Sequence, residues 1–119
     1  MILHLTTRDN WHASQQQGFV TAESLSTEGF IHCSTELQIL SVANKYYSGA
    51  KNMVLLLIDL ANLTAPIKWE PPAHIDGSPA KSNEPLFPHV YGEINIAAVT
   101  RMIDFPCDDS GHFVTPTEL

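Results

Sequence analysis

Cysteine and basic residues are both scarce in this sequence. The chain contains only two cysteines, Cys33 and Cys107, which lie far apart and form no CxxC pair. This pattern argues against a zinc cage and against a disulfide-stapled secreted domain, so we expect both thiols to be free. Lysine and arginine together number 6 against 13 aspartates and glutamates, which gives a formal net charge of −7. Because basic side chains supply most of the affinity for phosphate backbones, this balance argues against general nucleic-acid binding.

Long hydrophobic runs are absent as well. The longest, residues 53–58, is far shorter than the roughly 20 residues that a membrane-spanning helix needs, so we expect no membrane span. The opening residues, MILHLTTRDN, show no basic segment followed by a long apolar stretch and a small-residue cleavage site. This start predicts a mature chain in the cytoplasm.

The familiar nucleotide-binding and protease motifs are also missing. The glycines form neither GxGxxG nor the GxxxxGK loop, and there is no GxSxG or HExxH. A phosphate-binding loop and a metalloprotease site are therefore not expected. What remains is a set of 6 histidines, of which His4, His32 and His89 stand at the ends of predicted elements.

Helix-capping signals and short apolar runs alternate along the chain. Thr7 is the predicted cap of a first helix that ends at Gly18. Thr35 and Gln38 match a capping box that opens a second helix, with Gly49 as its stop. Strands are predicted over residues 2–5, 30–33, 53–60 and 67–70, and over 94–105 as one bent strand or two adjacent strands.

The length and the order of elements predict the architecture. A chain of 119 residues, 44% hydrophobic and 16% charged, has the size and composition of one compact domain. We expect a single α+β domain over residues 1–119, with a mixed β-sheet and flanking helices. Its core is expected within about residues 2–105, and the tail after Pro106 is expected to be peripheral. Residues 71–88 are rich in proline and predict a long irregular connection.

The segment GFIHCST is the first candidate site. His32 follows an apolar strand and precedes a helix start, so its ring could face a ligand whose anionic part lies on free helix N–H groups. The alternative is a hydrogen-bonded histidine at a strand end, beside Ser34 and Thr35 that only cap the helix. Cys33 points to the opposite face of the strand, which favours a small core residue over a nucleophile.

The segment FPHVYGE is the second candidate site. His89 and Tyr91 share one side of an extended chain, so both could point into one pocket and exchange or orient a proton. The alternative is a turn anchored by an aromatic residue. Glu70 stands at a strand end after Trp69, and Glu93 begins the strand that follows the histidine–tyrosine pair. Either could accept hydrogen bonds from ribose hydroxyls, stabilise a cationic transition state or remain an exposed charge.

Together with ANKYY, LLLIDL and WE, these segments give the chain a family resemblance. Over about residues 2–105 the sequence resembles small bacterial and plant proteins catalogued as domain of unknown function 952, in which GFIHxS and HxYG recur. That family looks related in fold to the ADP-ribosyltransferase-like group, which includes RNA 2′-phosphotransferases and NAD-using toxins. In this group an early-strand histidine or arginine binds the NAD ribose, aromatic residues hold the nicotinamide, and a later polar residue, often glutamate, completes the site.

The resemblance implies roles for particular residues here. His32 and Ser34 would be the early-strand pair, and His89 and Tyr91 would form a second wall of the pocket. The final glutamate has no unambiguous counterpart, because neither Glu70 nor Glu93 stands in a recognisable glutamate motif.

Three functional hypotheses follow. The leading one is an NAD-utilising transferase or glycohydrolase of ADP-ribosyltransferase-like fold, with NAD or an ADP-ribose-like nucleotide as the ligand. Its catalytic candidates are His32, His89, Tyr91, Glu70 and Glu93, and its ligand-binding candidates are Ser34, Thr35 and His4. The second hypothesis is a non-enzymatic metabolite sensor or partner-binding module that uses the same pocket. The third is a metal site built from His4, His32 and His89, because neutral imidazoles are good ligands for zinc and nickel. The oligomeric state is not predicted.

Overall fold

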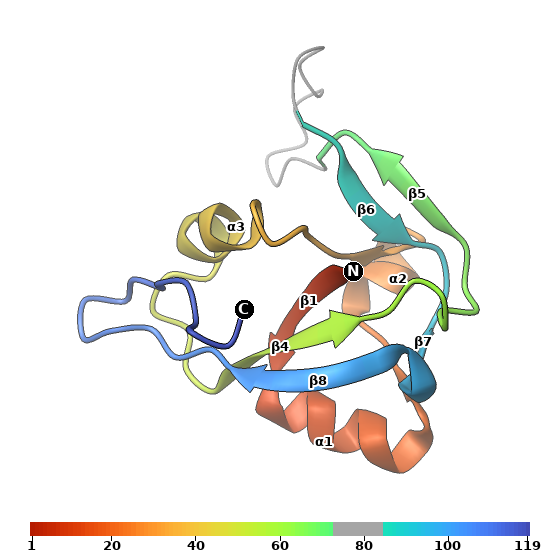
Figure 1. Cartoon of the computed structure of the whole chain (residues 1–119), viewed down its shortest axis with the longest axis horizontal. Coiled ribbons are helices and arrows are strands. Elements are labelled where there is room, and N and C mark those ends of the chain that lie inside the picture. The colour runs from red at the N-terminus through yellow and green to blue at the C-terminus, as the bar shows by residue number, and fades with distance from the viewer. Residues whose placement is uncertain (73–84) are drawn as a thin grey trace.

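The computed structural model describes residues 1–72 and 85–119. The described chain forms an α+β fold of short strands and few helices (Figure 1). Its elements are β1 (Ile2–Thr7), α1 (Arg8–Gln17), β2 (Phe19–Val20), α2 (Glu23–Thr27), β3 (Ile31–His32), α3 (Ile39–Tyr46), β4 (Met53–Ile58), β5 (Ile67–Glu70), β6 (Phe87–Val90), β7 (Ile94–Asn95), the 3₁₀ turn η1 (Ile96–Ala98) and β8 (Val99–Asp104). None of the described helices is long and apolar enough to cross a membrane.

The first sheet carries the hydrophobic centre of the molecule. Its order is β1-β4-β8, and β4 lies in the middle with all six residues buried. β1 runs antiparallel to β4 with Ile2 opposite Ile58, and β8 pairs antiparallel along the other edge. A continuous apolar strand such as MVLLLI is stable only where both sheet faces are covered, which is the case here.

A second sheet of order β3-β6-β5 stands beside the first. The two sheets are joined where Leu3 of β1 and Ser34, just after β3, exchange two backbone hydrogen bonds of 2.7 and 2.8 Å. A third, two-stranded sheet consists of β2 and β7. All of these ladders are antiparallel, so the expectation of a mixed sheet is wrong. Strand direction depends on how distant segments return to the sheet, and local sequence patterns do not contain that information.

Local signals at the helices behave largely as the sequence predicts. The Thr7 side chain accepts a hydrogen bond from the Asn10 backbone N–H, and Gly18 ends α1 in the left-handed conformation at φ 93°. The capping box is also formed, because Thr35 N–H donates to Gln38 Oε1 and Gln38 N–H donates to Thr35 Oγ1. Residues 35–38 form a turn, however, and α3 begins only at Ile39.

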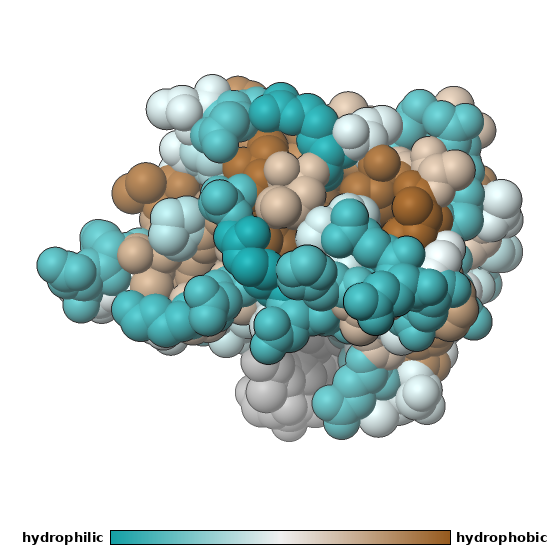
Figure 2. Space-filling view, turned by 90° about the horizontal axis from the view of Figure 1, so that it is seen from below, coloured by the Kyte–Doolittle hydropathy of each residue, from teal (hydrophilic) through white to brown (hydrophobic). Residues whose placement is uncertain are grey.

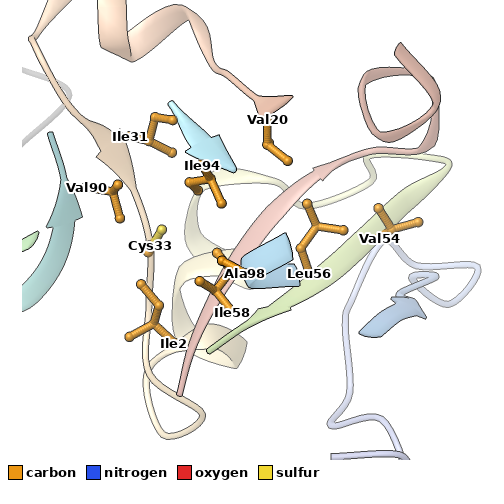
Figure 3. Close-up of a cluster of buried hydrophobic side chains, with 10 residues drawn as sticks. All are labelled: Ile2, Val20, Ile31, Cys33, Val54, Leu56, Ile58, Val90, Ile94 and Ala98. Atoms are coloured by element: carbon orange, nitrogen blue, oxygen red, sulfur yellow. The ribbon is translucent and has the colours of Figure 1, made fainter. Parts of the chain in front are cut away.

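Two hydrophobic clusters cover the two faces of the first sheet. The first cluster contains Ile2, Leu56 and Ile58 together with Ile31 and Val90 from the second sheet (Figure 3). Trp11 of α1 packs against this cluster. Seen from the side of α1, the molecular surface is largely hydrophilic with hydrophobic areas between the polar side chains (Figure 2).

The second cluster includes the segment after Pro106. It joins Leu3, Leu5 and Leu55 to residues of α3 and to Phe105 and Phe113, whose rings stack with centroids 4.7 Å apart. Phe113 is buried, so the tail that we expected to be peripheral contributes to the core. The sequence contains few apolar residues there, and a single aromatic side chain is enough to anchor the segment.

Candidate functional site

The candidate site lies on the face of the second sheet that is turned away from the first cluster. Ile31 and Val90 point into that cluster, so their strand neighbours His32 and His89 point to the opposite face. These two histidines are direct partners across β3 and β6. Because the Cys33 N–H donates to the Pro88 carbonyl, the adjacent histidine pair is the non-hydrogen-bonded kind, in which side chains approach closely. Their ring centroids are 5.5 Å apart.

His89 is held on several sides. Its Nδ1 is 2.9 Å from Glu70 Oε1 on the neighbouring strand β5, and its side chain is only 3% exposed. The Tyr91 hydroxyl donates a hydrogen bond to the same Glu70 oxygen. The Phe30 ring stacks on the imidazole with centroids 4.0 Å apart and an interplanar angle of 18°. The imidazole therefore has one fixed plane and one fixed partner.

The Glu70 oxygen that Tyr91 and His89 share changes the pKa values of Glu70 and Tyr91. Hydrogen bonds from Tyr91 and then His89 hold the pKa of the Glu70 carboxyl below its ordinary value. The same bond to Glu70 raises the pKa of Tyr91. The Lys68 ammonium lies 4.7 Å from the centroid of the Tyr91 ring and adds a positive charge nearby. At neutral pH the Glu70 carboxylate is thus ionised and the Tyr91 phenol is neutral.

His32 has a carboxylate partner of its own. Its Nε2 lies 2.8 Å from Glu28 Oε2, four residues earlier in the chain, and its side chain is 44% exposed. When His32 is protonated, this contact is an ion pair. The Phe30 ring also meets the His32 imidazole edge-on at 4.9 Å, so one aromatic side chain contacts both histidines.

Both imidazoles border one cavity of about 490 Å³. The second sheet supplies one wall, and α3 supplies the opposite wall through Lys45, Tyr46 and its neighbour Tyr47. The described lining consists of Glu28, His32, Cys33, Ser34, Ser41, Val42, Lys45, Tyr46, Tyr47, Pro72, Pro85, Phe87 and His89. Apolar walls with a few convergent polar groups are typical of small-molecule sites of this size.

The structure brings some of the predicted site residues together and separates others. His32, Ser34 and His89 line the cavity, and Glu70 and Tyr91 lie behind His89 rather than on the cavity wall. The pairing of His89 and Tyr91 on one side of their strand agrees with the sequence analysis.

Thr35 and Glu93 lie outside the cavity lining. The backbone N–H and the hydroxyl of Thr35 are both engaged by Gln38, so the capping box occupies groups that we expected to hold a phosphate. Glu93 is exposed in the connection between β6 and β7. This leaves Glu93 without contact to either histidine in the cavity wall.

His4 does not face the cavity. Its ring is buried between the two sheets, and Nδ1–H donates to the His32 carbonyl oxygen over 2.8 Å. Burial lowers the pKa of His4. Within residues 1–72 and 85–119, no group of three or more histidine, cysteine or carboxylate side chains is placed to hold a metal ion. The expectations that His4 binds a ligand and that it forms a metal site with His32 and His89 are therefore wrong.

Part of the cavity wall was not predicted from the sequence. Glu28 lies four residues before His32, and this spacing was the available signal for the ion pair. Tyr46 and Tyr47 continue an apolar helix pattern, which is typical of core residues, yet both border the cavity. Lys45, on the same wall, also borders the cavity. Cys33 is buried, and burial raises the pKa of its thiol, as expected of a core residue.

Comparison with known proteins identifies relatives of the same shape. The crystal structure of protein CC0527 from Caulobacter crescentus has a TM-score of 0.79 and 30% sequence identity, and the alignment covers 95% of this chain and 92% of that one. The solution NMR structure of the same protein has a TM-score of 0.73 and 30% identity, over 92% of this chain and 88% of that one. No curated protein matches significantly. The relation to the ADP-ribosyltransferase-like group stays a prediction.

A family model matches most of the chain. It covers residues 5–102 and is described as "Protein of unknown function (DUF952)". The match includes both histidine segments and both strands that carry them. The chain therefore belongs to the DUF952 family.

Proposed function

We propose that the cavity binds a nucleotide of the NAD or ADP-ribose class and that the protein cleaves or transfers at the glycosidic bond of this ligand. One observation carries the proposal. Two imidazoles, each bonded to its own carboxylate, meet 5.5 Å apart at one cavity of about 490 Å³. Imidazole–carboxylate pairs are the usual means by which proteins position proton donors and acceptors.

The chemistry of the walls fits the parts of such a nucleotide. Glu28 and His32 offer polar atoms for a ribose diol, and the rings of Tyr46 and Tyr47 offer a surface for a base. Lys45 supplies a cation for a phosphate group on the same wall. The resemblance to ADP-ribosyltransferase-like proteins selects NAD among the ligands with these parts.

Glycosidic cleavage has a defined course at this site. The bond between the ribose carbon and the nicotinamide nitrogen breaks, and its electron pair leaves with neutral nicotinamide. The positive charge that develops on the ribose is stabilised by the carboxylate of Glu28. A water oxygen bonds to the ribose carbon, and the proton that it loses passes to His89. Glu28 replaces Glu70 and Glu93 as the carboxylate in this role, because it lines the cavity.

Calorimetric titration tests binding. We expect wild-type protein to bind NAD or ADP-ribose, and we expect His32→Ala and His89→Ala to weaken binding at least about tenfold, which corresponds to about 1.4 kcal/mol. The matched control is His12→Ala, an exposed histidine of α1 that is outside the cavity lining, and its affinity should equal that of wild type. Absence of binding to wild type at millimolar nucleotide would contradict the proposal.

A metabolite sensor without turnover is the second candidate function. It is favoured by the fact that both imidazoles already have satisfied carboxylate partners without a ligand. Chromatographic assay for nicotinamide and for ADP-ribosylated products separates the two functions. If NAD binds and neither product forms over long incubation, that result favours the sensor over the enzyme.

A further inference from the structure

We propose that Glu70 and Tyr91 are positioning residues that fix the tautomer of His89, so that its Nε2 presents a lone pair to the cavity and accepts a proton there. This inference deepens the proposed function and rests on it for the identity of the proton donor. It differs from the sequence-based hypothesis, in which Glu70 and Tyr91 were themselves catalytic.

The inference rests on the geometry at Nδ1 of His89. Glu70 Oε1 lies 2.9 Å from Nδ1, and an ionised carboxylate can only accept, so the proton between them belongs to Nδ1. A neutral imidazole carries one ring proton, and the hydrogen bond at one nitrogen decides the state of the other. In the neutral form of His89, Nε2 is then the nitrogen without a proton.

Tyr91 keeps the carboxylate in its accepting state. Its hydroxyl donates to the oxygen that His89 uses, so Glu70 receives two hydrogen bonds at one atom. Charge-assisted hydrogen bonds of this kind favour the ionised carboxylate, and the pKa of Glu70 is lowered accordingly. Lys68, across from His89 in the β5–β6 register, adds positive charge on the same strand as Glu70.

The free nitrogen has access to the cavity. His89 is a lining residue even though its ring is 3% exposed, and Phe30 stacked on the ring blocks rotation out of the plane. Among the residues that the structure describes, Nε2 of His89 has no hydrogen-bond partner. A water or hydroxyl held in the cavity can give its proton to Nε2, while Nδ1–H stays bonded to Glu70.

Nitrogen NMR of the histidine rings tests the inference without any ligand. In ¹⁵N-labelled wild type, at a pH at which the His89 ring is neutral, its two ring nitrogens should show separate shifts typical of a protonated Nδ1 and an unprotonated Nε2. Glu70→Ala should abolish this single tautomer, so that both shifts move toward an exchange average. Tyr91→Phe should cause a smaller change in the same direction. The control Glu23→Ala removes an exposed carboxylate at the start of α2 and should leave the His89 shifts unchanged.

The outcomes separate this inference from the proposed function. A neutral His89 ring with its proton on Nε2 in the wild type overturns it, and so does an unchanged tautomer in a folded Glu70→Ala variant. The wild-type measurement needs no variant, so poor folding of Glu70→Ala cannot leave the inference undecided. A fixed Nδ1–H tautomer in a protein that binds no NAD would support the positioning role and reject the nucleotide.

Discussion

The imidazole of His4 adds a side-chain hydrogen bond to the connection between the two main sheets. Nδ1–H bonds to the His32 carbonyl, while Nε2 is buried without a partner among the described residues. A buried polar atom without a partner costs free energy, and a second proton on this ring would cost more. Such a residue makes the stability of the fold sensitive to pH close to the candidate site.

The pH dependence has a defined sign. Because burial lowers the pKa of His4 in the folded state, the unfolded chain binds more protons in mild acid. The contribution of neutral His4 to the free energy of unfolding is full above the ordinary histidine pKa of about 6.5 and declines as pH falls below it. We predict that wild type loses stability between pH 7 and pH 5 and that His4→Leu loses less over the same range, as measured by urea unfolding at both pH values.

The same substitution also has a cost at neutral pH. Replacing His4 leaves the His32 carbonyl without this donor, and an unsatisfied buried acceptor costs about 1–3 kcal/mol. The control His12→Ala changes an exposed histidine and should preserve both the stability and its pH dependence. An unaltered pH profile in His4→Leu would contradict the assignment of this sensitivity to His4.

A second prediction at the residue scale concerns the Tyr91 hydroxyl. Its pKa is raised by the hydrogen bond to Glu70, so the contribution of this bond is full below the ordinary tyrosine pKa of about 10 and is lost as pH rises through the raised value. In Glu70→Ala, Tyr91 should ionise closer to its ordinary range. Tyrosinate absorbance during an alkaline titration measures this, and Tyr91→Phe identifies the step that belongs to Tyr91. If the step keeps its position without Glu70, the bond is not its cause.

Among the elements, α3 has a role that its sequence only partly predicts. The polar residue Asn44 clamps the segment after β8, because its Nδ2 donates to the Phe113 carbonyl and its Oδ1 accepts from the Phe113 N–H. These two bonds hold the Phe113 ring against Phe105 in the second cluster. A side-chain amide that pairs with both backbone groups of one residue can replace a missing strand partner.

We predict that Asn44→Ala destabilises the protein by about 1–3 kcal/mol, because two partly buried backbone groups lose their partners. Amide hydrogen exchange at Phe113 should accelerate by more than the global change in stability. Ser41→Ala, at an exposed position of the same helix, should alter stability by less than about 0.5 kcal/mol. Equal stability of Asn44→Ala and Ser41→Ala would show that the clamp contributes nothing.

Elements with a strong local signal were predictable, and their pairing was not. The range of β5 and the limits of α1 at Thr7 and Gly18 follow from capping residues and apolar runs. The antiparallel arrangement and the late start of α3 depend on contacts between distant segments. At the site, strand alternation correctly placed His32 opposite Cys33. The approach of Glu28 and α3 to the cavity requires the tertiary fold.

At the scale of the whole molecule, the dimensions are those of one domain. The radius of gyration is 13.8 Å, close to the roughly 13.5 Å that chain length predicts for a compact fold. The candidate cavity lies between the second sheet and α3, and these two elements contact opposite hydrophobic clusters. Ligand binding at the cavity should therefore depend on both clusters at once.

Strand β4 contributes buried side chains to both clusters. Leu56 belongs to the first cluster and Leu55 to the second, and each is fully buried. We predict that Leu55→Ala and Leu56→Ala each lower the free energy of unfolding by about 2–5 kcal/mol, as is typical of a buried leucine. Each variant should still unfold in one transition that tryptophan fluorescence and far-ultraviolet circular dichroism report at the same urea concentration.

The exposed Leu37 provides the matched control for these two variants. Its side chain is 96% exposed, so Leu37→Ala should change stability by less than about 0.5 kcal/mol. If the two faces of the first sheet unfolded separately, Leu55→Ala would move only the transition that involves α3 and Phe113, and the two probes would diverge. Because adjacent residues of one buried strand point into opposite clusters, loss of either leucine weakens the same strand, and we expect the probes to coincide.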